Sequence, residues 1–150
     1  MTDFSAGLNG FFSGEHRRCD ALWAEVEAAV DNGDAATAQT AWQAFAHSMQ
    51  RHFTMEEEIL FPSFEAATGM QGGGPTFVMR AEHQQMRALL QQMADAAEAG
   101  DFDTVVDDGD TLLMLIQQHN AKEEGILYPM AEQHLAGDWQ QLSQRLAKIE

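Results

Sequence analysis

Apolar residues recur along this chain at alternating steps of three and four positions, the spacing that gathers them on one face of an α-helix. Alternation with a period of two, which would indicate strands, is scarce. Breaks rich in Gly and Asp divide the pattern into helices predicted over roughly 9–31, 36–66, 76–98 and 103–147. The pattern predicts an all-α fold, an antiparallel four-helix bundle that runs up, down, up and down.

Each predicted apolar stripe also carries histidine or glutamate near its middle. The inward positions are Phe12, His16, Cys19 and Trp23 in the first helix, Met49, His52, Glu56 and Ile59 in the second, Met79, His83, Met86 and Leu90 in the third, and Leu112, Leu115, His119, Glu123 and Ile126 in the fourth. Because a buried polar group without a partner is costly, these histidines and glutamates are candidates for chemistry.

The sequence repeats at an interval of 67 positions, the distance between His52 and His119. The phrases "HFTMEEEILFP" and "HNAKEEGILYP" begin at these two residues, and the same shift carries His16 onto His83. We therefore expect an internal two-fold pseudo-repeat within a single domain, residues 1–150, with halves over about 9–66 and 76–147.

The repeat includes a proline inside the second and the fourth helical patterns. Pro62 and Pro129 each stand six residues after a glutamate of the stripe. Since proline lacks a backbone N–H and its ring crowds the preceding turn, each is expected to kink or restart its helix.

Helix geometry predicts that the polar residues of the stripes meet. His16 and His52 are equidistant from the turn at Asp34, so an antiparallel hairpin places them at one level, about 27 Å from the loop at about 1.5 Å per residue. His83 and His119 stand in the same relation to the second hairpin. Glu56 and Glu123 each follow a histidine by four residues, one turn along the same face, so that six donors converge inside the bundle.

Six such groups at matched levels favour a metal centre over ordinary packing. Burying carboxylates without a cation costs several kcal/mol each, and a bound metal removes that cost. The donor set contains no thiolate, exceeds one tetrahedral zinc site and is too rich in imidazole for calcium or magnesium. Two carboxylates able to bridge indicate two metals, for which iron fits best and manganese and zinc are alternatives.

The order of His16, His52-x-x-x-Glu56, His83 and His119-x-x-x-Glu123 resembles the hemerythrin-like HHE cation-binding domain, over nearly the whole chain. The resemblance implies a four-helix bundle around two iron ions, Fe²⁺ or Fe³⁺, joined by an oxo or hydroxo bridge and by Glu56 and Glu123. "GGGPTFVMRAEH" (72–83) is further similar to a segment of the di-iron proteins that repair damaged iron-sulfur centres.

Two departures from the oxygen-carrying hemerythrins bear on function. Those carriers have a fifth histidine four residues after the third and an aspartate five residues after the last, where this chain has Arg87 and Glu124. The remaining donors leave about one open position on each metal. We therefore expect dioxygen or nitric oxide to bind there, for oxygen binding, sensing or detoxification.

Two other functions use the same residues. One is a di-iron redox enzyme, a peroxidase or nitric oxide reductase, which would act on peroxide or nitric oxide with electrons from an external donor. The other is an iron donor for the repair of iron-sulfur centres. The sequence does not decide whether the protein is an enzyme.

Residues around the proposed ligands carry weaker expectations. Asp20 and Arg87 occupy equivalent places in the two halves and are predicted to pair over the open positions, either to assist a bound ligand or as an ordinary salt bridge. Tyr128 is within reach of a bridging group, but its counterpart is Phe61, which favours packing. Further expectations are that Met49, Met79 and Met86 line a dry pocket, that Glu57 and Glu124 lie outside the coordination sphere, and that His47 and His134 lie outside the ligand register.

Composition limits which binding partners and which cellular compartment are expected. The chain has 24 acidic and 8 basic side chains, a formal charge of −16, which argues against nucleic acid and anionic membrane as partners. No stretch approaches the roughly 20 apolar residues of a membrane span, and the start of the chain lacks a signal-peptide pattern. The single cysteine, Cys19, cannot form an internal disulfide, so a cytoplasmic location is expected.

Overall fold

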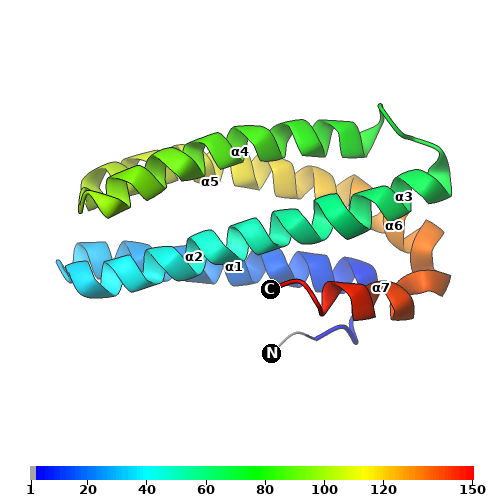
Figure 1. Ribbon diagram of the computed structural model, residues 1–150, viewed down its shortest axis with the longest axis horizontal. Helices are drawn as coiled ribbons and strands as arrows, with labels where there is room; N and C mark the ends of the chain where they lie inside the picture. The colour runs from blue at the N-terminus through cyan, green and yellow to red at the C-terminus, as the bar shows by residue number, and fades with distance from the viewer. Residues whose placement is uncertain (1–2) are drawn as a thin grey trace.

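A computed structural model describes residues 3–150, and these residues fold into an antiparallel four-helix bundle (Figure 1). The long arms are α1 (Gly7–Asp31), α2 (Ala35–Met55), α4 (Pro75–Glu98) and α5 (Phe102–Lys122). The predicted all-α class is confirmed, since residues 3–150 contain no strand. Within that same span, no helix has both the length and the apolar character that crossing a bilayer requires.

The two hairpins of the bundle are closed by the same device. Asp34 precedes α2 and accepts a hydrogen bond from the backbone N–H of Thr37 at 3.1 Å, and Asp101 precedes α5 and accepts from that of Thr104 at 3.2 Å. A glycine with a positive φ, 70° and 76° respectively, stands directly before each aspartate. The pseudo-repeat therefore extends to the turns, which fixes both histidine pairs at matched heights.

The helices widen where the glutamates of the repeat occur. A five-residue π-helical segment follows each of α2 and α5: η1 (Glu56–Leu60) and η2 (Glu123–Leu127). New α-helices then begin, α3 (Phe61–Thr68) and α6 (Tyr128–Leu135), and Pro62 and Pro129 are their second residues. The wider turn accommodates a residue that cannot donate to the preceding turn, so the predicted restart at each proline is confirmed.

The prediction that the last helical segment extends beyond Pro129 to about residue 147 is wrong. α6 ends at Leu135, a 3₁₀ turn η3 (Ala136–Asp138) follows, and α7 (Trp139–Leu146) turns back alongside the bundle (Figure 1). Leu142 and Leu146 of α7 are buried in the apolar cluster near the start of α1. The Trp139 indole N–H also donates to the Phe4 carbonyl at 3.0 Å. The gain from burying this apolar face favours the reversal over a longer helix.

One predicted inward residue, Ile126, lies outside and is 56% exposed. The following residue, Leu127, is buried instead. The repeat counterpart of Ile126 is Ile59, which lies in the equivalent π-helical segment but is buried, because α7 packs against η1.

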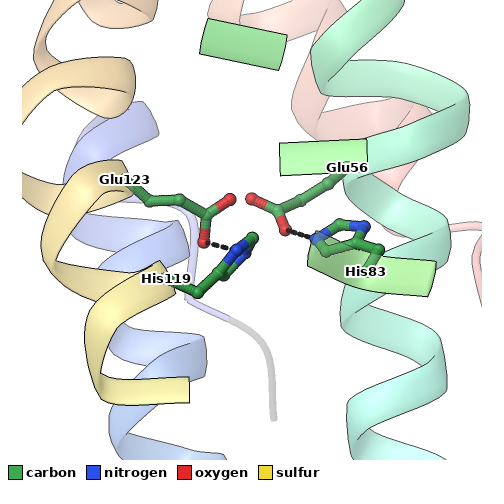
Figure 2. Close-up of side chains that lie close together, drawn as sticks. All are labelled: Glu56, His83, His119 and Glu123. Carbon is green, nitrogen blue, oxygen red and sulfur yellow. Dashed lines mark ion pairs between the residues drawn. The ribbon is translucent and has the colours of Figure 1, made fainter. Parts of the chain in front are cut away.

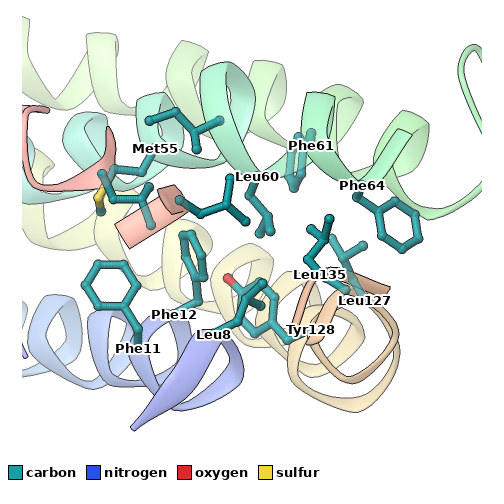
Figure 3. Close-up of a cluster of buried hydrophobic side chains, with 14 of the residues drawn as sticks. Leu8, Phe11, Phe12, Met55, Leu60, Phe61, Phe64, Leu127, Tyr128 and Leu135 are labelled. Atoms are coloured by element: carbon teal, nitrogen blue, oxygen red, sulfur yellow. The ribbon is translucent and has the colours of Figure 1, made fainter. Parts of the chain in front are cut away.

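The core consists of two apolar clusters with a polar layer between them. One cluster, partly drawn in Figure 3, includes Leu8, Phe12, Leu60, Phe64 and Leu135. The other includes Trp23, Phe45, Leu90, Met93 and Leu112. In this second cluster α1 and α5 approach closely, since a Cβ built on Gly109 would lie 2.1 Å from the Trp23 ring. The polar layer is thus enclosed on both sides by packed apolar side chains.

Candidate metal centre

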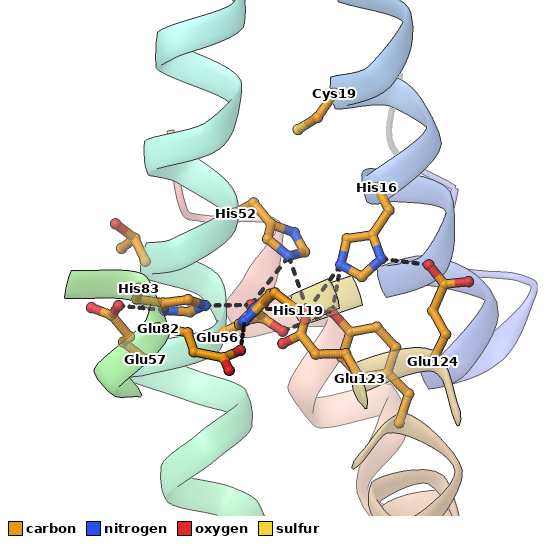
Figure 4. Close-up of polar contacts among 12 residues, drawn as sticks. His16, Cys19, His52, Glu56, Glu57, Glu82, His83, His119, Glu123 and Glu124 are labelled. Atoms are coloured by element: carbon orange, nitrogen blue, oxygen red, sulfur yellow. Dashed lines mark hydrogen bonds and ion pairs between the residues drawn. The ribbon is translucent and has the colours of Figure 1, made fainter. Parts of the chain in front are cut away.

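The structure brings the six predicted ligands together in the polar layer, as Figure 4 shows. All six are at most 5% exposed: His16, His52, Glu56, His83, His119 and Glu123. Each imidazole turns its Nε2 toward a carboxylate. The Nε2 atoms of His52 and His83 lie 3.1 and 3.2 Å from Glu56 Oε1, and those of His16 and His119 lie 3.0 and 3.2 Å from Glu123 Oε1.

Most of these close atoms are not hydrogen-bonded to one another. Among residues 3–150, the Nε2 atoms of His52, His83 and His119, with Glu56 Oε1 and Glu123 Oε2, have no hydrogen-bond partner. Two donors bound at right angles to one ion, each at about 2.1 Å, lie about 3.0 Å apart. The observed separations are close to that value and the lone pairs converge, so the residues fit a metal ion.

The donors form two groups, and within each group the ligating atoms lie within 4.8 Å of one another. The first group, which we call the His83 position, is Glu56, His83, His119 and Glu123 (Figure 2). The second, the His16 position, is His16, His52 and Glu123. Glu123 belongs to both groups, and a shared carboxylate is the feature that joins two metal ions in one centre.

Electrostatics in the metal-free centre favour charged forms. Burial acts to lower the pKa of His52, but the carboxylates of Glu56 and Glu123, 3.1 and 4.0 Å from its Nε2, outweigh it and raise this pKa well above its usual range. The pKa values of His83 and His119 are also raised, because nearby carboxylates again outweigh burial. Burial acts to raise the pKa of Glu123, yet its hydrogen bonds hold it well below the usual range. Protons held by the histidines must therefore leave when a metal binds.

Carboxylates also support the outer ring nitrogens. The Nδ1 atoms lie 2.7 Å from Glu124 Oε2 for His16, 2.6 Å from Glu57 Oε2 for His83 and 2.9 Å from Glu82 Oε1 for His119. Such partners fix the tautomer and orientation of a ligand histidine. The sequence placed Glu57 and Glu124 outside the coordination sphere, as observed, but it missed Glu82. The available signal was the repetition of Glu15-His16 as Glu82-His83.

The predicted ion pair between Asp20 and Arg87 is wrong. The Arg87 Nη1 instead lies 2.6 and 2.8 Å from the two carboxylate oxygens of Glu57, and its Nε donates to Gln50 at 3.1 Å. Asp20 is largely exposed and lies near Glu124. The partial burial of its carboxylate, together with the charge of Glu124, raises the pKa of Asp20, although the nearby imidazole of His16 acts to lower it. Each residue thus lies near a glutamate that supports a histidine of the centre, Arg87 near Glu57 and Asp20 near Glu124.

Tyr128 makes more than packing contacts. Its side chain is fully buried, and its O–H lies 2.7 Å from Glu56 Oε2, 2.9 Å from Glu123 Oε1 and 3.0 Å from His16 Nε2. Burial, and then the charges of both carboxylates, raise the pKa of Tyr128 well above its usual value, so the group is a hydrogen-bond donor. The expectation that packing explains this residue is corrected.

The remaining candidates flank the centre. Met79 is buried in the apolar cluster of Leu8, and Met49 and Met86 are buried in that of Trp23, so the three methionines lie on both sides of the polar layer. Their dry pocket stays a prediction. Cys19 lies with Sγ 3.2 Å from Ser48 Oγ, and burial raises the pKa of its thiol.

A surface groove between α1 and α5 reaches the centre at His16. The residues that line it include His16, Asp20, Trp23, Ile116, Asn120 and Glu124. Asp20 and Glu124 give its mouth a negative charge.

Comparison with known proteins agrees with this geometry. The family model described as hemerythrin HHE cation binding domain matches residues 8–131. An uncharacterised hemerythrin-like protein of Schizosaccharomyces pombe is 28% identical over 124 residues, which is 81% of this chain and 58% of that protein. No solved structure matches the chain.

Shorter matches link the chain to proteins named iron-sulfur cluster repair protein YtfE. The protein from Yersinia pseudotuberculosis is 40% identical over 48 residues, 32% of this chain and 22% of its own length. That from Yersinia pestis is 45% identical over 40 residues, 27% of this chain and 18% of its own length. The chain thus matches just over half the length of the yeast relative and about a fifth of the repair proteins.

Proposed function

Because the chain belongs to the hemerythrin HHE cation-binding domain family, we propose that it is a non-haem di-iron protein that binds a small diatomic ligand, dioxygen or nitric oxide. The observation that carries the proposal is the buried set of four imidazoles and two carboxylates in two groups that share Glu123. Four imidazole nitrogens, two carboxylates and the sharing of one of them suit iron, and when bound the iron would supply exchangeable coordination positions and redox chemistry.

The side chains that replace carrier ligands support open positions. Arg87 stands where the oxygen carriers have a fifth histidine, and its guanidinium pairs with Glu57 outside the centre. Glu124 stands where they have an aspartate, and it pairs with the outer nitrogen of His16. Both side chains are engaged outside the donor set, so neither would fill a coordination position of bound iron, which supports a place for a ligand from solution.

The surroundings also suit a small, weakly polar ligand. Apolar clusters enclose the polar layer on both sides, and the groove between α1 and α5 opens to solvent at His16. The Tyr128 O–H is the neutral donor that faces both carboxylates, and it would be able to donate a hydrogen bond to a small ligand of the iron that Glu56 and Glu123 would hold. The carboxylates on the outer ring nitrogens keep the imidazoles oriented.

A second candidate function, iron donation for repair of iron-sulfur centres, is favoured by the short YtfE matches. Those matches cover about a fifth of the repair proteins, so they support a shared segment and leave the repair activity a proposal. Both candidates require the same di-iron centre.

The visible spectrum of the iron-loaded chain tests the proposal. It is recorded without oxygen, in air, and with nitric oxide. We expect a band that appears in air and fades when oxygen is removed, or a nitrosyl spectrum that titrates with the iron. Unchanged spectra with both gases would contradict diatomic binding. Irreversible oxidation with turnover of peroxide and a reductant would instead indicate the redox enzyme.

A matched pair of histidine variants makes the spectral test specific. His119→Ala removes a donor of the centre, whereas His47→Ala makes the same substitution at an exposed histidine outside it. We expect the ligand-dependent spectrum to be lost in the first variant and kept in the second. Equal spectra in both variants would place the coloured species elsewhere on the chain.

A further inference from the structure

The pseudo-repeat breaks at the groups that support the histidines. His119 Nδ1 lies 2.9 Å from Glu82 Oε1, whereas the equivalent atom of His52 has no hydrogen-bond partner in the described part of the chain. Glu15, the counterpart of Glu82, is turned toward Arg51, whose Nη1 lies 2.8 Å from Glu15 Oε1. One buried imidazole of the His16 position therefore lacks the support that its equivalent receives.

A second break concerns how firmly the supporting carboxylates are held. Glu57, the partner of His83, is 22% exposed and is fixed by Arg87 at 2.6 and 2.8 Å. Glu124, the counterpart of Glu57, is 43% exposed and has Asp20 nearby where the other half has Arg87. A cation thus holds one carboxylate in place, while a like charge repels the other.

The third carboxylate that supports a histidine, Glu82, is also held by a basic side chain. Glu82 is paired with Lys122 as well as with His119. Both carboxylates that support histidines of the His83 position, Glu57 and Glu82, therefore have a basic partner, whereas the carboxylate that supports His16, Glu124, has an acidic neighbour.

The two positions also differ in their access to solvent, and the His16 position is the more accessible one. His83 is completely buried, with the Phe53 and Phe61 rings at centroid distances of 4.3 and 5.6 Å. His16 lines the groove between α1 and α5, and Figure 4 shows Glu124 beside it on the outer side. An ion or a chelator arriving from water therefore meets the His16 position first.

We propose that the two metal positions are unequal: the ion at the His83 position is retained, and the ion at the His16 position exchanges through the groove between α1 and α5. Loss of a partner on an outer ring nitrogen typically weakens metal binding about 10–100-fold. The positive charges of Arg87 and Lys122 also repel a metal cation, which by itself would weaken binding at the His83 position. This repulsion is small, because charges in partly exposed ion pairs change an equilibrium only a few-fold. The orientation of the donors therefore decides the order.

This inference rests on the proposed di-iron centre and adds which ion leaves. The test loads the chain with Fe²⁺ without oxygen, confirms two irons, and follows release to an excess of a chromophoric Fe²⁺ chelator by absorbance. We expect two phases of equal amplitude with rates at least about 10-fold apart. Two irons released in a single phase would overturn the inference alone. Fewer than two irons before the chelator is added would overturn the proposed function, and this inference with it.

Three variants assign the phases. Glu82→Gln removes the acceptor from His119 and should accelerate the slow phase about 10–100-fold while leaving the fast one unchanged. Asp20→Arg copies Arg87 into the other half and should slow the fast phase by fixing Glu124. Glu98→Gln, an exposed position on the same helix as Glu82, should change neither phase. If Glu82→Gln accelerates the fast phase, or Asp20→Arg slows the slow one, the assignment is overturned.

Discussion

The replacement of Tyr128 by phenylalanine removes one oxygen atom from the centre and keeps the buried ring. In the metal-free chain the hydroxyl lies 2.7 and 2.9 Å from oxygens of Glu56 and Glu123, both completely buried. A hydrogen bond to a charged group contributes about 1.5–3 kcal/mol, and a single hydroxyl proton is shared by the two carboxylates, so the loss is about 2–3 kcal/mol. At about 2–4 °C per kcal/mol for a chain of this size, Tm should fall by about 4–12 °C.

The effect should depend on the metal. Bound iron neutralises the same carboxylate oxygens, so the loaded Tyr128→Phe variant should lose less stability than the metal-free one. Thermal and urea unfolding, followed by far-ultraviolet circular dichroism, measures how much stability Tyr128→Phe loses relative to the wild type in the metal-free form and in the iron-loaded form. The chain has a single tyrosine, so no other phenol is present to obscure the comparison.

A buried aromatic residue outside the centre provides the control. Phe64 is completely buried in the same apolar cluster, and Phe64→Leu should lower Tm by similar amounts in the metal-free and loaded forms. A Tyr128→Phe variant whose metal-free form unfolds like the wild type would refute the role given to the hydroxyl. Equal losses in both forms would refute the link between the hydroxyl and the metal site.

Three further predictions follow from the packing and charges of the chain. Gly109→Ala should lower the free energy of unfolding, measured in urea, by about 1–3 kcal/mol, because the new Cβ would lie 2.1 Å from the Trp23 ring. Unchanged stability would mean that α1 and α5 move apart at little cost. The raised pKa values of His52, His83 and His119 stabilise the metal-free fold fully below about pH 6.5, and this stability is lost as pH rises through the raised values. The difference in Tm between the iron-loaded and the metal-free chain should therefore widen from acidic to alkaline pH, and a difference that narrows instead would contradict these electrostatics. Cys19 should react slowly with a thiol reagent in the native chain and rapidly in urea, since burial raises its pKa; fast native reaction would show that the α1 face opens.

The fold and the convergence of the six polar side chains were predictable because helix geometry is rigid. The spacing of His52 and Glu56, together with the distances of His16 and His52 from the Asp34 turn, determines that these side chains lie on one face and near one level. The same rule applied to the second half identifies the equivalent donors. Local spacing was sufficient because each relation depends on one helix or one tight hairpin.

The partners of Arg87, Tyr128 and Glu82 were not predictable in the same way. Whether a side chain next to a ligand turns inward or outward depends on the rotation of each helix against its neighbours, which helical periodicity does not determine. Periodicity also placed Ile126 inside, but burial at this position of the repeat depends on tertiary packing, since its counterpart Ile59 is buried in the cluster that contains the α7 leucines. The reversal before α7 depends on burying Leu142 and Leu146 against distant parts of the chain, and local sequence carries little signal of such contacts.

The iron content of the chain after anaerobic loading with Fe²⁺ and removal of free metal tests the central claim most directly. The wild type and the His47→Ala control should each retain two irons per chain. Glu123→Ala, which removes the carboxylate shared by both positions, should retain one or none while keeping the helical content of the metal-free fold. Two irons per chain in Glu123→Ala, or fewer than two in the wild type, would contradict a carboxylate-bridged di-iron centre at these residues.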